Sequence, residues 1–357
     1  MGTESESRRR LKDDHRLVQR KVFVMIKLAI VGAGYWGPNL IRNFMSIDEC
    51  EVKLICDSDP EQLTKVGEGK AEVELTTDSS KVVNSDADAV VVATSAETHY
   101  ALVKEILGAG KDVFVEKPLT LSVSEGEELV ELADSRDRIL MVGHILLYHP
   151  AVKMLKSYIT DGTLGKVYYL YSARLNLGRV RRDENALWAF APHDVSIILH
   201  LLESMPDSVQ ASGECYLRDG IFDVVFMSMH FADKSMAQVH VSWLDPHKTR
   251  KITVVGSKKM AVFDDVQSME KIRIYDKGFD YTPAYASYPE SLTLRIGDIH
   301  IPKIDGREPL GLECEHFLEC IKTRKKPVSD GENGLRVLRV LEAAQKSLDQ
   351  KGKPFKP

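Results

Sequence analysis

A glycine-rich turn between a strand and a helix is the feature that most constrains the fold. Residues 27–33, KLAIVGA, are a continuous apolar run, and residues 38–45, PNLIRNFM, have helical spacing with a proline at a first helical position. The turn reads GAGYWG and places Gly32, Gly34 and Gly37 in a G-x-G-x-x-G pattern. Such glycines let the backbone approach a pyrophosphate at the helix N-terminus. The pattern predicts a dinucleotide-binding unit.

The first part of the chain, residues 25–147, alternates short apolar strands with short helices. The predicted strands are 27–33, 52–58, 87–95, 111–118 and 138–145, and the predicted helices are 38–45, 60–68, 98–110 and 122–135. Uniformly apolar strands are typical of a sheet that is covered on both faces. The alternation predicts a Rossmann-type, doubly wound parallel sheet, and this part is expected to be an NAD-binding domain.

Two charged residues follow strands of this sheet. Asp57 ends the second predicted strand, 20 residues after Gly37, where a carboxylate binds the ribose hydroxyls of NAD and repels the extra phosphate of NADP. Lys117 ends the strand VFVEKP, and ligands of doubly wound sheets bind beyond the carboxyl ends of the strands. Lys117 is therefore expected to face the cofactor and to stabilise charge on a substrate oxygen. The alternative is a surface lysine in a loop.

The second part, residues 148–357, has a different pattern. Longer alternating strands are predicted at 166–177, 222–232, 236–244, 250–257, 259–265 and 271–277, and helices at 150–162, 311–324 and 334–350. This pattern predicts an α+β domain with an open, mostly antiparallel sheet that has one solvated or partner-covered face. We expect this domain to bind the substrate.

Composition excludes several classes of protein. A net charge of −5 argues against a nucleic-acid binder, and no apolar run approaches the length of a membrane span. The five cysteines show no zinc spacing and are expected to be reduced, which favours a cytoplasmic protein. Residues 1–24 are charged and are expected to be a disordered extension outside the fold. His316 lies among glutamates, but no convincing metal-ligand set accompanies it, so no metal site is predicted.

His193 is the candidate general base. Pro192 is predicted to start a helix, which places His193 in the first turn, where the helix N-terminus disfavours imidazolium. A neutral imidazole would accept a proton near pH 7. The alternative is a histidine that caps the helix or packs between the domains.

An arginine-rich stretch, SARLNLGRVRRDEN, precedes this helix. Arginine binds phosphate and carboxylate oxygens in pairs, so Arg174 and then Arg179 are candidate substrate ligands, with Asn176 for a sugar hydroxyl. The alternative is a solvated basic loop, above all for Arg181 and Arg182.

Three blocks, AIVGAGYWGPN, VFVEKPL and APHDVSIIL, resemble the Gfo/Idh/MocA oxidoreductase family. The resemblance extends over about residues 25–350 and implies a Rossmann domain followed by an α/β domain whose large antiparallel sheet forms homodimers or homotetramers. It implies that Lys117 and His193 lie beside the nicotinamide and the reacting hydroxyl. It also implies that Tyr148, just after the last predicted strand of the first domain, contacts the substrate, with an ordinary interface aromatic as the alternative. The cofactor site that it implies comprises Gly32, Gly34, Tyr35, Trp36, Gly37, Asp57, Thr94, Ser95, His99, Glu116 and Lys117.

Further stretches around residues 175–202, 307–321 and 334–348 resemble the branch of this family that oxidises the C3 hydroxyl of UDP-linked sugar acids such as UDP-N-acetyl-glucosaminuronate. The resemblance implies NAD as a tightly held cofactor and a 2-oxo acid as a second oxidant. Ala189 stands where many family members carry an aspartate, one helical turn before the histidine. Two alternatives follow: a cyclitol or free-sugar dehydrogenase, and an NAD-binding sensor without catalysis.

Overall fold

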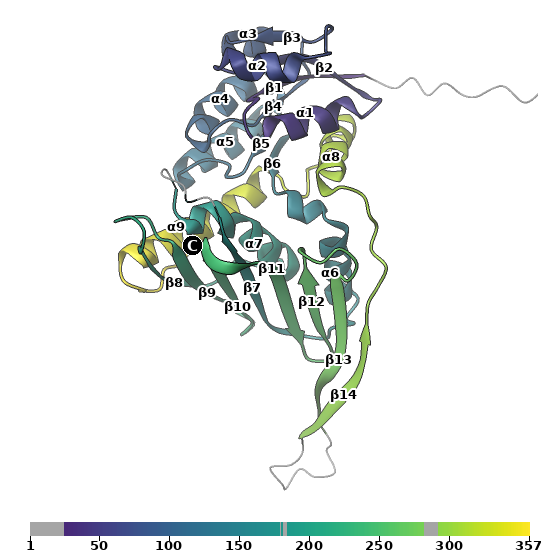
Figure 1. The fold of residues 1–357 in the computed structure, drawn as a ribbon, viewed down its shortest axis with the longest axis vertical. Coiled ribbons are helices and arrows are strands. Elements are labelled where there is room, and N and C mark those ends of the chain that lie inside the picture. Colours follow the sequence, from purple (N-terminus) through teal and green to yellow (C-terminus); the bar gives the residue numbers. More distant parts are fainter. Residues whose placement is uncertain (1–24, 179, 181–183, 282–291) are drawn as a thin grey trace, which may run out of the picture.

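The computed structural model describes residues 25–178, 180, 184–281 and 292–357 of the chain. These residues form two sheets, each with its own helices, and the cleft described below lies between them (Figure 1). Among the described residues, no helix is long and apolar enough to cross a bilayer.

The first sheet is a six-stranded parallel sheet with the order β3-β2-β1-β4-β5-β6. Its strands are β1 (Ile26–Val31), β2 (Cys50–Cys56), β3 (Glu74–Thr76), β4 (Ala89–Val92), β5 (Asp112–Glu116) and β6 (Leu140–Gly143). The helices that connect them are α1 (Gly37–Met45), α2 (Pro60–Gly67), α3 (Ser79–Asn84), α4 (Ala96–Gly108) and α5 (Val123–Ser135). The doubly wound Rossmann sheet predicted from the alternating pattern is confirmed. The short β3 and α3 were not predicted.

The second sheet has eight strands in the order β14-β13-β12-β11-β7-β10-β9-β8. They are β7 (Val167–Leu177), β8 (Ser208–Glu214), β9 (Val224–His230), β10 (Met236–Ser242), β11 (Leu244–Gly256), β12 (Met260–Asp264), β13 (Ile272–Tyr281) and β14 (Leu292–His300). All neighbours are antiparallel except β7 and β10, which are parallel. The mostly antiparallel sheet is confirmed, and β8 and β14 are additional to the prediction.

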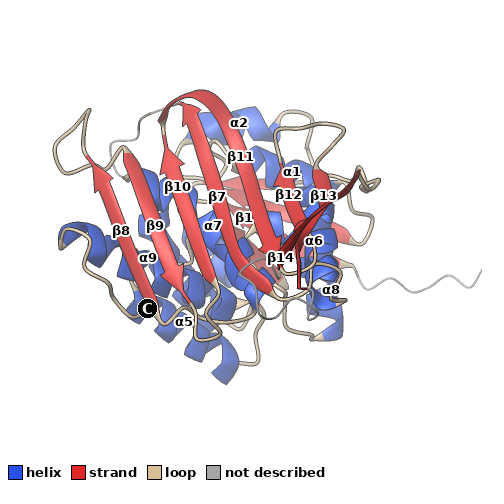
Figure 2. Cartoon of the chain, turned by 90° about the horizontal axis from the view of Figure 1, so that it is seen from below, coloured by secondary structure: helices blue, strands red, loops and turns tan. Residues whose placement is uncertain are grey.

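Among the described residues, helices pack on one face of this second sheet. A 3₁₀ turn, η1 (Ile145–Tyr148), leads into α6 (Pro150–Thr160), and α6, α7 (Ala186–Leu202) and α9 (Gly331–Asp349) pack on that face. Figure 2 shows the opposite face in front of the described helices. Its exposed aromatic side chains include Tyr169, Tyr171 and Phe226. An open face is therefore present, as the alternating strands predict.

The last two helices return to the first sheet. The α8 helix (Pro309–Thr323) packs on α1, and α9 packs on α5 and β6. Arg42 of α1 forms a bidentate ion pair with Glu308, which precedes α8, at 2.8 and 3.1 Å. Arg324, which follows α8, donates hydrogen bonds to the buried Asp112 of β5 at 2.6 and 3.1 Å. The C-terminal helices therefore pack on the first sheet and its helices, α9 also packs on β8 of the second sheet, and α8 begins at Pro309, which lines the cleft.

Candidate active site

The glycine turn has the geometry of a pyrophosphate cradle. Gly32 has φ +102°, and a Cβ there would lie 2.5 Å from the backbone of Ala93. A Cβ on Gly37 would lie 2.1 Å from the carbonyl oxygen of Gly32. A Cβ on Gly34, in contrast, would meet no atom within 4 Å, and Gly34 lines the cleft. The first and third glycines close the turn, and the second leaves room for a ligand against the backbone, as dinucleotide binding requires.

Asp57 lies at the end of β2, beside this turn. Its Oδ2 accepts a hydrogen bond from the backbone N–H of Ala33 at 2.6 Å, and its Oδ1 accepts one from Asp59 at 2.9 Å. The carboxylate lines the cleft and is held in one orientation by these two bonds. This position is the one from which an acid binds the ribose hydroxyls of NAD, so the residues present fit the cofactor.

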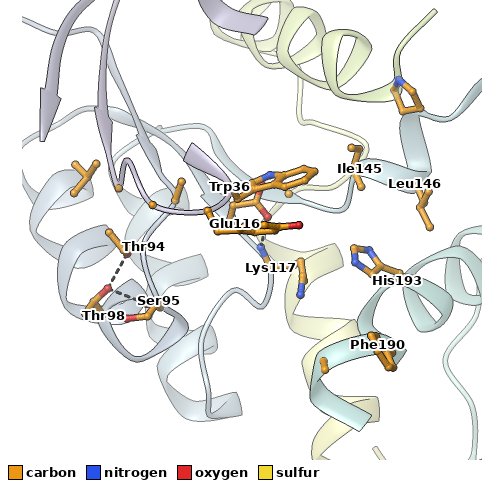
Figure 3. Close-up of a pocket in the computed structure, with 18 of the residues that line it drawn as sticks. Trp36, Thr94, Ser95, Thr98, Glu116, Lys117, Ile145, Leu146, Phe190 and His193 are labelled. Atoms are coloured by element: carbon orange, nitrogen blue, oxygen red, sulfur yellow. Dashed lines mark hydrogen bonds between the residues drawn. The ribbon is translucent and has the colours of Figure 1, made fainter. Parts of the chain in front are cut away.

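A single cleft of about 1360 Å³ joins the glycine turn to the second sheet. The sequence-predicted site residues that line it are Gly32, Gly34, Tyr35, Trp36, Asp57, Thr94, Ser95, Glu116, Lys117, Arg174, Asn176 and His193. Figure 3 shows side chains from the Rossmann loops on one side of the cleft and from α7 on the other. The structure therefore brings together most of the residues that the sequence singled out, although they come from both halves of the chain.

Lys117 follows β5 directly and enters the cleft. Glu116 is paired in register with Gly143 of β6, and a Cβ on that glycine would lie 3.0 Å from the Glu116 carboxyl, so the acid lies flat on the neighbouring strand. The Lys117 backbone N–H donates to Oε2 of Glu116 at 3.2 Å. Burial raises the pKa of Glu116 to about 7, against the opposing effect of the Lys117 charge. Figure 3 shows the Lys117 side chain and the His193 ring entering the same cavity.

His193 lies inside α7, not in its first turn. The helix begins at Ala186, after Asn185 caps it by accepting the N–H of Trp188 at 3.2 Å, and Pro192 lies within the helix. The predicted start at Pro192 is wrong. Proline favours the first position of a helix, so the local sequence indicates a start there, and only the tertiary packing of the apolar α7 shows that the helix begins further upstream. The helix N-terminus therefore does not explain the protonation state of His193.

Other causes keep this imidazole neutral. Burial is the largest cause, followed by the positive charges of Arg174 and Lys117. Together they hold the pKa of His193 well below its usual range. Its Nδ1 has no hydrogen-bond partner among the described residues. Ala189, one helical turn earlier, also lines the cleft and provides no carboxylate to oppose this effect. A neutral ring beside a lysine ammonium suits a general base that acts on an alcohol.

Arg174 is held by an acid. The buried Asp194, next to His193 in the sequence, accepts hydrogen bonds from Nε of Arg174 at 2.6 Å and from Nη2 at 3.4 Å. Its carboxylate also accepts a hydrogen bond from the hydroxyl of Ser172. Arg174 lines the cleft, but part of its hydrogen-bonding capacity is used by Asp194. Asn176, two residues along the same strand, lines the cleft too. Arg179 lies outside the described residues, as do Arg181 and Arg182.

Three predicted site residues lie behind the cleft wall rather than in it. Gly37 closes the glycine turn, as described above. The buried ring of His99 bridges two loops, with Nδ1 2.8 Å from the Pro118 carbonyl oxygen and Nε2 3.2 Å from that of Thr94. Tyr148 is fully buried, and its hydroxyl lies 2.8 Å from the Ser329 hydroxyl. The expected cofactor contact of His99 and substrate contact of Tyr148 are corrected accordingly, because both side chains are enclosed by the chain itself.

Several cleft residues were missed by the sequence reasoning. Arg250, Asp265 and Lys271 line the cleft from the second sheet, and Asp265 lies 3.5 Å from Arg250 and 3.6 Å from Lys271. The only local signal was a charged residue at each end of otherwise apolar strand segments, which is also typical of ordinary strand ends. Their proximity depends on strand register, which no short motif encodes.

Among the described residues, no group of three or more histidine, cysteine or acidic side chains is placed to hold a metal ion. His316 accepts the backbone N–H of Val328 at 3.1 Å and lies beside the Tyr148 ring. The histidine therefore packs from α8 against η1.

Sequence comparisons relate this chain to sugar-processing enzymes. A UDP-N-acetylglucosamine 3-dehydrogenase of Acidithiobacillus ferrooxidans is 25% identical over 88% of this chain and 95% of its own length. A myo-inositol 2-dehydrogenase of Thermotoga maritima is 23% identical over 91% of this chain and 97% of its own. A 2,7-anhydro-N-acetylneuraminate hydratase of Mediterraneibacter gnavus is 28% identical over 58% of this chain, but the match spans only 59% of that enzyme.

Solved structures share the fold. GenD2 from gentamicin A biosynthesis, in complex with NAD, has a TM-score of 0.78 at 21% identity and covers 93% of this chain and 96% of its own. The A. ferrooxidans UDP-N-acetylglucosamine 3-dehydrogenase has a TM-score of 0.77 at 22% identity, over 92% and 98%. Family profiles match residues 26–144, as an oxidoreductase family with an NAD-binding Rossmann fold, and residues 152–262, as the GFO/IDH/MocA C-terminal domain. The chain belongs to the Gfo/Idh/MocA family of NAD-binding oxidoreductases.

Proposed function

We propose that this chain is an NAD-dependent dehydrogenase that oxidises the C3 hydroxyl of a UDP-linked sugar acid, similar to UDP-N-acetyl-glucosaminuronate, to a 3-keto sugar. The observation that carries the proposal is that Lys117 and a neutral His193 enter one cleft that also contains the glycine turn and Asp57. A general base and a cation beside a nicotinamide site are the groups that alcohol oxidation needs.

Each of the two residues has a distinct role in the proposed reaction. The His193 imidazole accepts the proton of the substrate hydroxyl, and the Lys117 ammonium donates a hydrogen bond to the same oxygen and stabilises the charge that develops there. Bound NAD supplies the hydride acceptor for the adjacent carbon. The positive charge of Lys117 helps to lower the pKa of His193 and so favours the neutral imidazole.

The substrate assignment draws on the second half of the cleft. Arg174 and Asn176 line it beside His193 and are proposed substrate contacts, with Arg179 as a third candidate. A relative named as a UDP-N-acetylglucosamine 3-dehydrogenase, similar over most of both chains, supports a nucleotide sugar and the C3 position. A 2-oxo acid is the proposed second oxidant that restores NAD. We further propose a cytoplasmic enzyme that assembles as a homodimer or homotetramer through the open face of the second sheet.

A second candidate is a cyclitol or free-sugar dehydrogenase. The similarity to a myo-inositol 2-dehydrogenase over 91% of this chain favours it. A third candidate, an NAD-binding sensor, is suggested by Ala189, where many relatives carry an acid. The cations that line the substrate half of the cleft favour the nucleotide-sugar candidate over both.

The test is a substrate panel with NAD present. UDP-N-acetyl-glucosaminuronate, UDP-N-acetylglucosamine, myo-inositol and glucose are mixed with the protein and NAD, and reduced-nicotinamide absorbance is followed with and without 2-oxoglutarate. Formation of reduced cofactor with the UDP-sugar acid is the expected result. Turnover on inositol or glucose alone would replace the proposal with the second candidate, and binding of NAD without turnover on any compound would favour the third.

A further inference from the structure

Two arginines face each other across neighbouring strands at the substrate half of the cleft. The register of β7 and β11 pairs Arg174 directly with Arg250, so both side chains leave the sheet on the same face. Directly opposed residues of antiparallel strands have Cβ atoms about 4.5–5.5 Å apart, and like charges there destabilise the sheet. The carboxylates of Asp194 and Asp265 offset part of this repulsion, and an anionic ligand bound to both guanidinium groups would offset more of it.

Each arginine has a separate carboxylate partner that fixes its position. Asp194 of α7 holds Arg174 at 2.6 Å, and Asp265, just after β12, lies 3.5 Å from the Arg250 guanidinium. The backbone adds to the second contact, because the Asp265 N–H donates to the Arg250 carbonyl at 2.9 Å. The two guanidinium groups are therefore set in place before any ligand arrives.

Lys271 is a third cation near the two arginines, and Arg174, Arg250 and Lys271 together are called the cationic row. Lys271, which precedes β13, lies 3.6 Å from the Asp265 carboxylate, and its Nζ donates to the Asp265 carbonyl at 3.1 Å. Asp265 thus lies between Arg250 and Lys271, and all of them line the cleft. Arg174 is buried, whereas the Arg250 side chain is 44% exposed and the Lys271 side chain 26% exposed, so these two remain accessible from the cleft.

The row lies beside the catalytic candidates. Arg174 and Arg250 are both close enough to His193 to depress its pKa, and Ala189 provides no acid on the facing helix. The acids Asp57 and Glu97 line the part of the cleft formed by the Rossmann loops. At the second sheet the cleft is lined by Arg174, Arg250 and Lys271, with the acid Asp265 between the last two, and Asp305 and Glu308 line it near the start of α8.

We propose that Arg174, Arg250 and Lys271 form an anion-binding subsite that positions the substrate through a carboxylate or a diphosphate group. This inference rests on the proposed function for the identity of the substrate, but the subsite itself is a property of the free cleft. Guanidinium groups bind either anion through paired hydrogen bonds, and Lys271 adds a point charge. The ligand relieves the repulsion between the two arginines, which couples substrate binding to the local stability of the sheet.

Calorimetric titration measures the subsite without requiring catalysis. The ligands are UDP-N-acetyl-glucosaminuronate, UDP-N-acetylglucosamine, glucuronate and inorganic pyrophosphate, each added to the NADH-loaded protein so that no oxidation occurs. The variants are Arg250→Gln and Lys271→Gln. The control is Lys251→Gln, which makes the same charge change one residue along β11, on the opposite sheet face, where Lys251 pairs with Asp264 at 3.4 Å. NADH binding reports that each variant is folded.

Loss of a charged hydrogen bond predicts that Arg250→Gln weakens binding of the anionic ligands by about tenfold or more, with a smaller loss in Lys271→Gln and none in Lys251→Gln. Loss confined to UDP-N-acetyl-glucosaminuronate and glucuronate assigns the subsite to a carboxylate. Loss shared with UDP-N-acetylglucosamine and pyrophosphate assigns it to the diphosphate.

Two outcomes overturn the subsite: unchanged affinities in Arg250→Gln, and absence of binding by all four anions to the wild-type protein. Failure of the proposed function looks different. In that case anions bind and the variants weaken them, but the wild-type protein forms no reduced nicotinamide with either UDP-sugar.

Discussion

The carboxylate of Asp57 accepts the backbone N–H of Ala33 at 2.6 Å, which fixes an acid from the end of β2 beside the glycine turn. This contact joins the two parts of the cofactor site that lie 24 residues apart in the sequence. It orients the carboxylate toward the cleft, where the ribose hydroxyls of NAD are expected, and places a negative charge where the extra phosphate of NADP would lie.

Replacing Asp57 by asparagine keeps the size of the side chain and removes its charge. We expect the dissociation constant for NADH to rise about tenfold or more, because charged hydrogen bonds to the ribose are lost, while binding of NADPH weakens less or improves. Fluorescence titration of both cofactors measures this. Asp59→Asn is the matched control, since Asp59 caps α2 and does not line the cleft. Equal losses for NADH and NADPH would contradict the assigned role.

The pH dependence of oxidation reports on His193. Burial, Arg174 and Lys117 lower its pKa, so the neutral, proton-accepting form persists as the pH falls below the usual range of a histidine. We expect the single-turnover rate at saturating substrate to fall only well below pH 6.5. Arg250→Gln removes one of the charges that depress the pKa, so the acid limb should move to higher pH. An acid limb at or above the usual histidine range in the wild-type protein would exclude this environment.

Ala189→Asp introduces a carboxylate one helical turn before His193, on the same face of α7. The new charge should raise the pKa of His193 and move the acid limb of the rate to higher pH. It should also oppose the cationic row and weaken binding of an anionic substrate by about tenfold, in the range of a charged interaction. Rates measured across pH and calorimetric titration at neutral pH separate the two effects. A variant with wild-type values in both would show that Ala189 lies outside the reacting region.

Glu313 is a buried acid that the proposed chemistry does not use. It lies on α8 with both carboxyl oxygens lacking a hydrogen-bond partner among the described residues, and burial, with the nearby Glu116, raises its pKa well above the usual range. An acid whose pKa is higher in the folded chain costs no stability below its unfolded pKa and costs more as the pH rises toward its folded pKa.

Glu313→Met should therefore stabilise the protein by about 1–3 kcal/mol at neutral pH, since an unpaired polar group is replaced by an apolar one of similar length. The gain should shrink as the pH falls toward 4.5, where the unfolded carboxyl also protonates. Denaturant unfolding at several pH values measures this difference. Glu319→Met, an exposed position on the same helix, is the control and should change little. A destabilised Glu313→Met protein would show that the acid has a partner in solution.

The parts of the fold and site that depend on local pattern were predictable. The glycine turn, Asp57 and the apolar strands can each be recognised from a few neighbouring residues. The turn needs glycines for backbone freedom, Asp57 ends a strand, and a strand of a sheet covered on both faces is apolar throughout. Lys117 could be placed in the cleft for the same reason, since ligands of doubly wound sheets bind beyond the carboxyl ends of the strands and Lys117 follows such an end. The strand and helix alternation then fixed the class of the first domain.

Features that depend on distant partners were not predictable. Tyr148 is enclosed because Ser329, 181 residues away, accepts or donates at its hydroxyl. The predicted start of α7 is too late because proline favours a helix start locally, whereas Pro192 lies within a helix that begins at Ala186. Arg250 could not be linked to Arg174 because their proximity follows from the register of β7 and β11.

The measurement that tests the central claim most directly is the single-turnover rate of nicotinamide reduction in wild-type, Lys117→Met and His193→Phe proteins, with UDP-N-acetyl-glucosaminuronate and saturating NAD. Because both side chains are proposed to act on one hydroxyl oxygen, each substitution should lower the rate by about 10²–10⁴-fold while the dissociation constant for NADH changes little. A variant of either residue that reduces NAD at the wild-type rate would contradict the account.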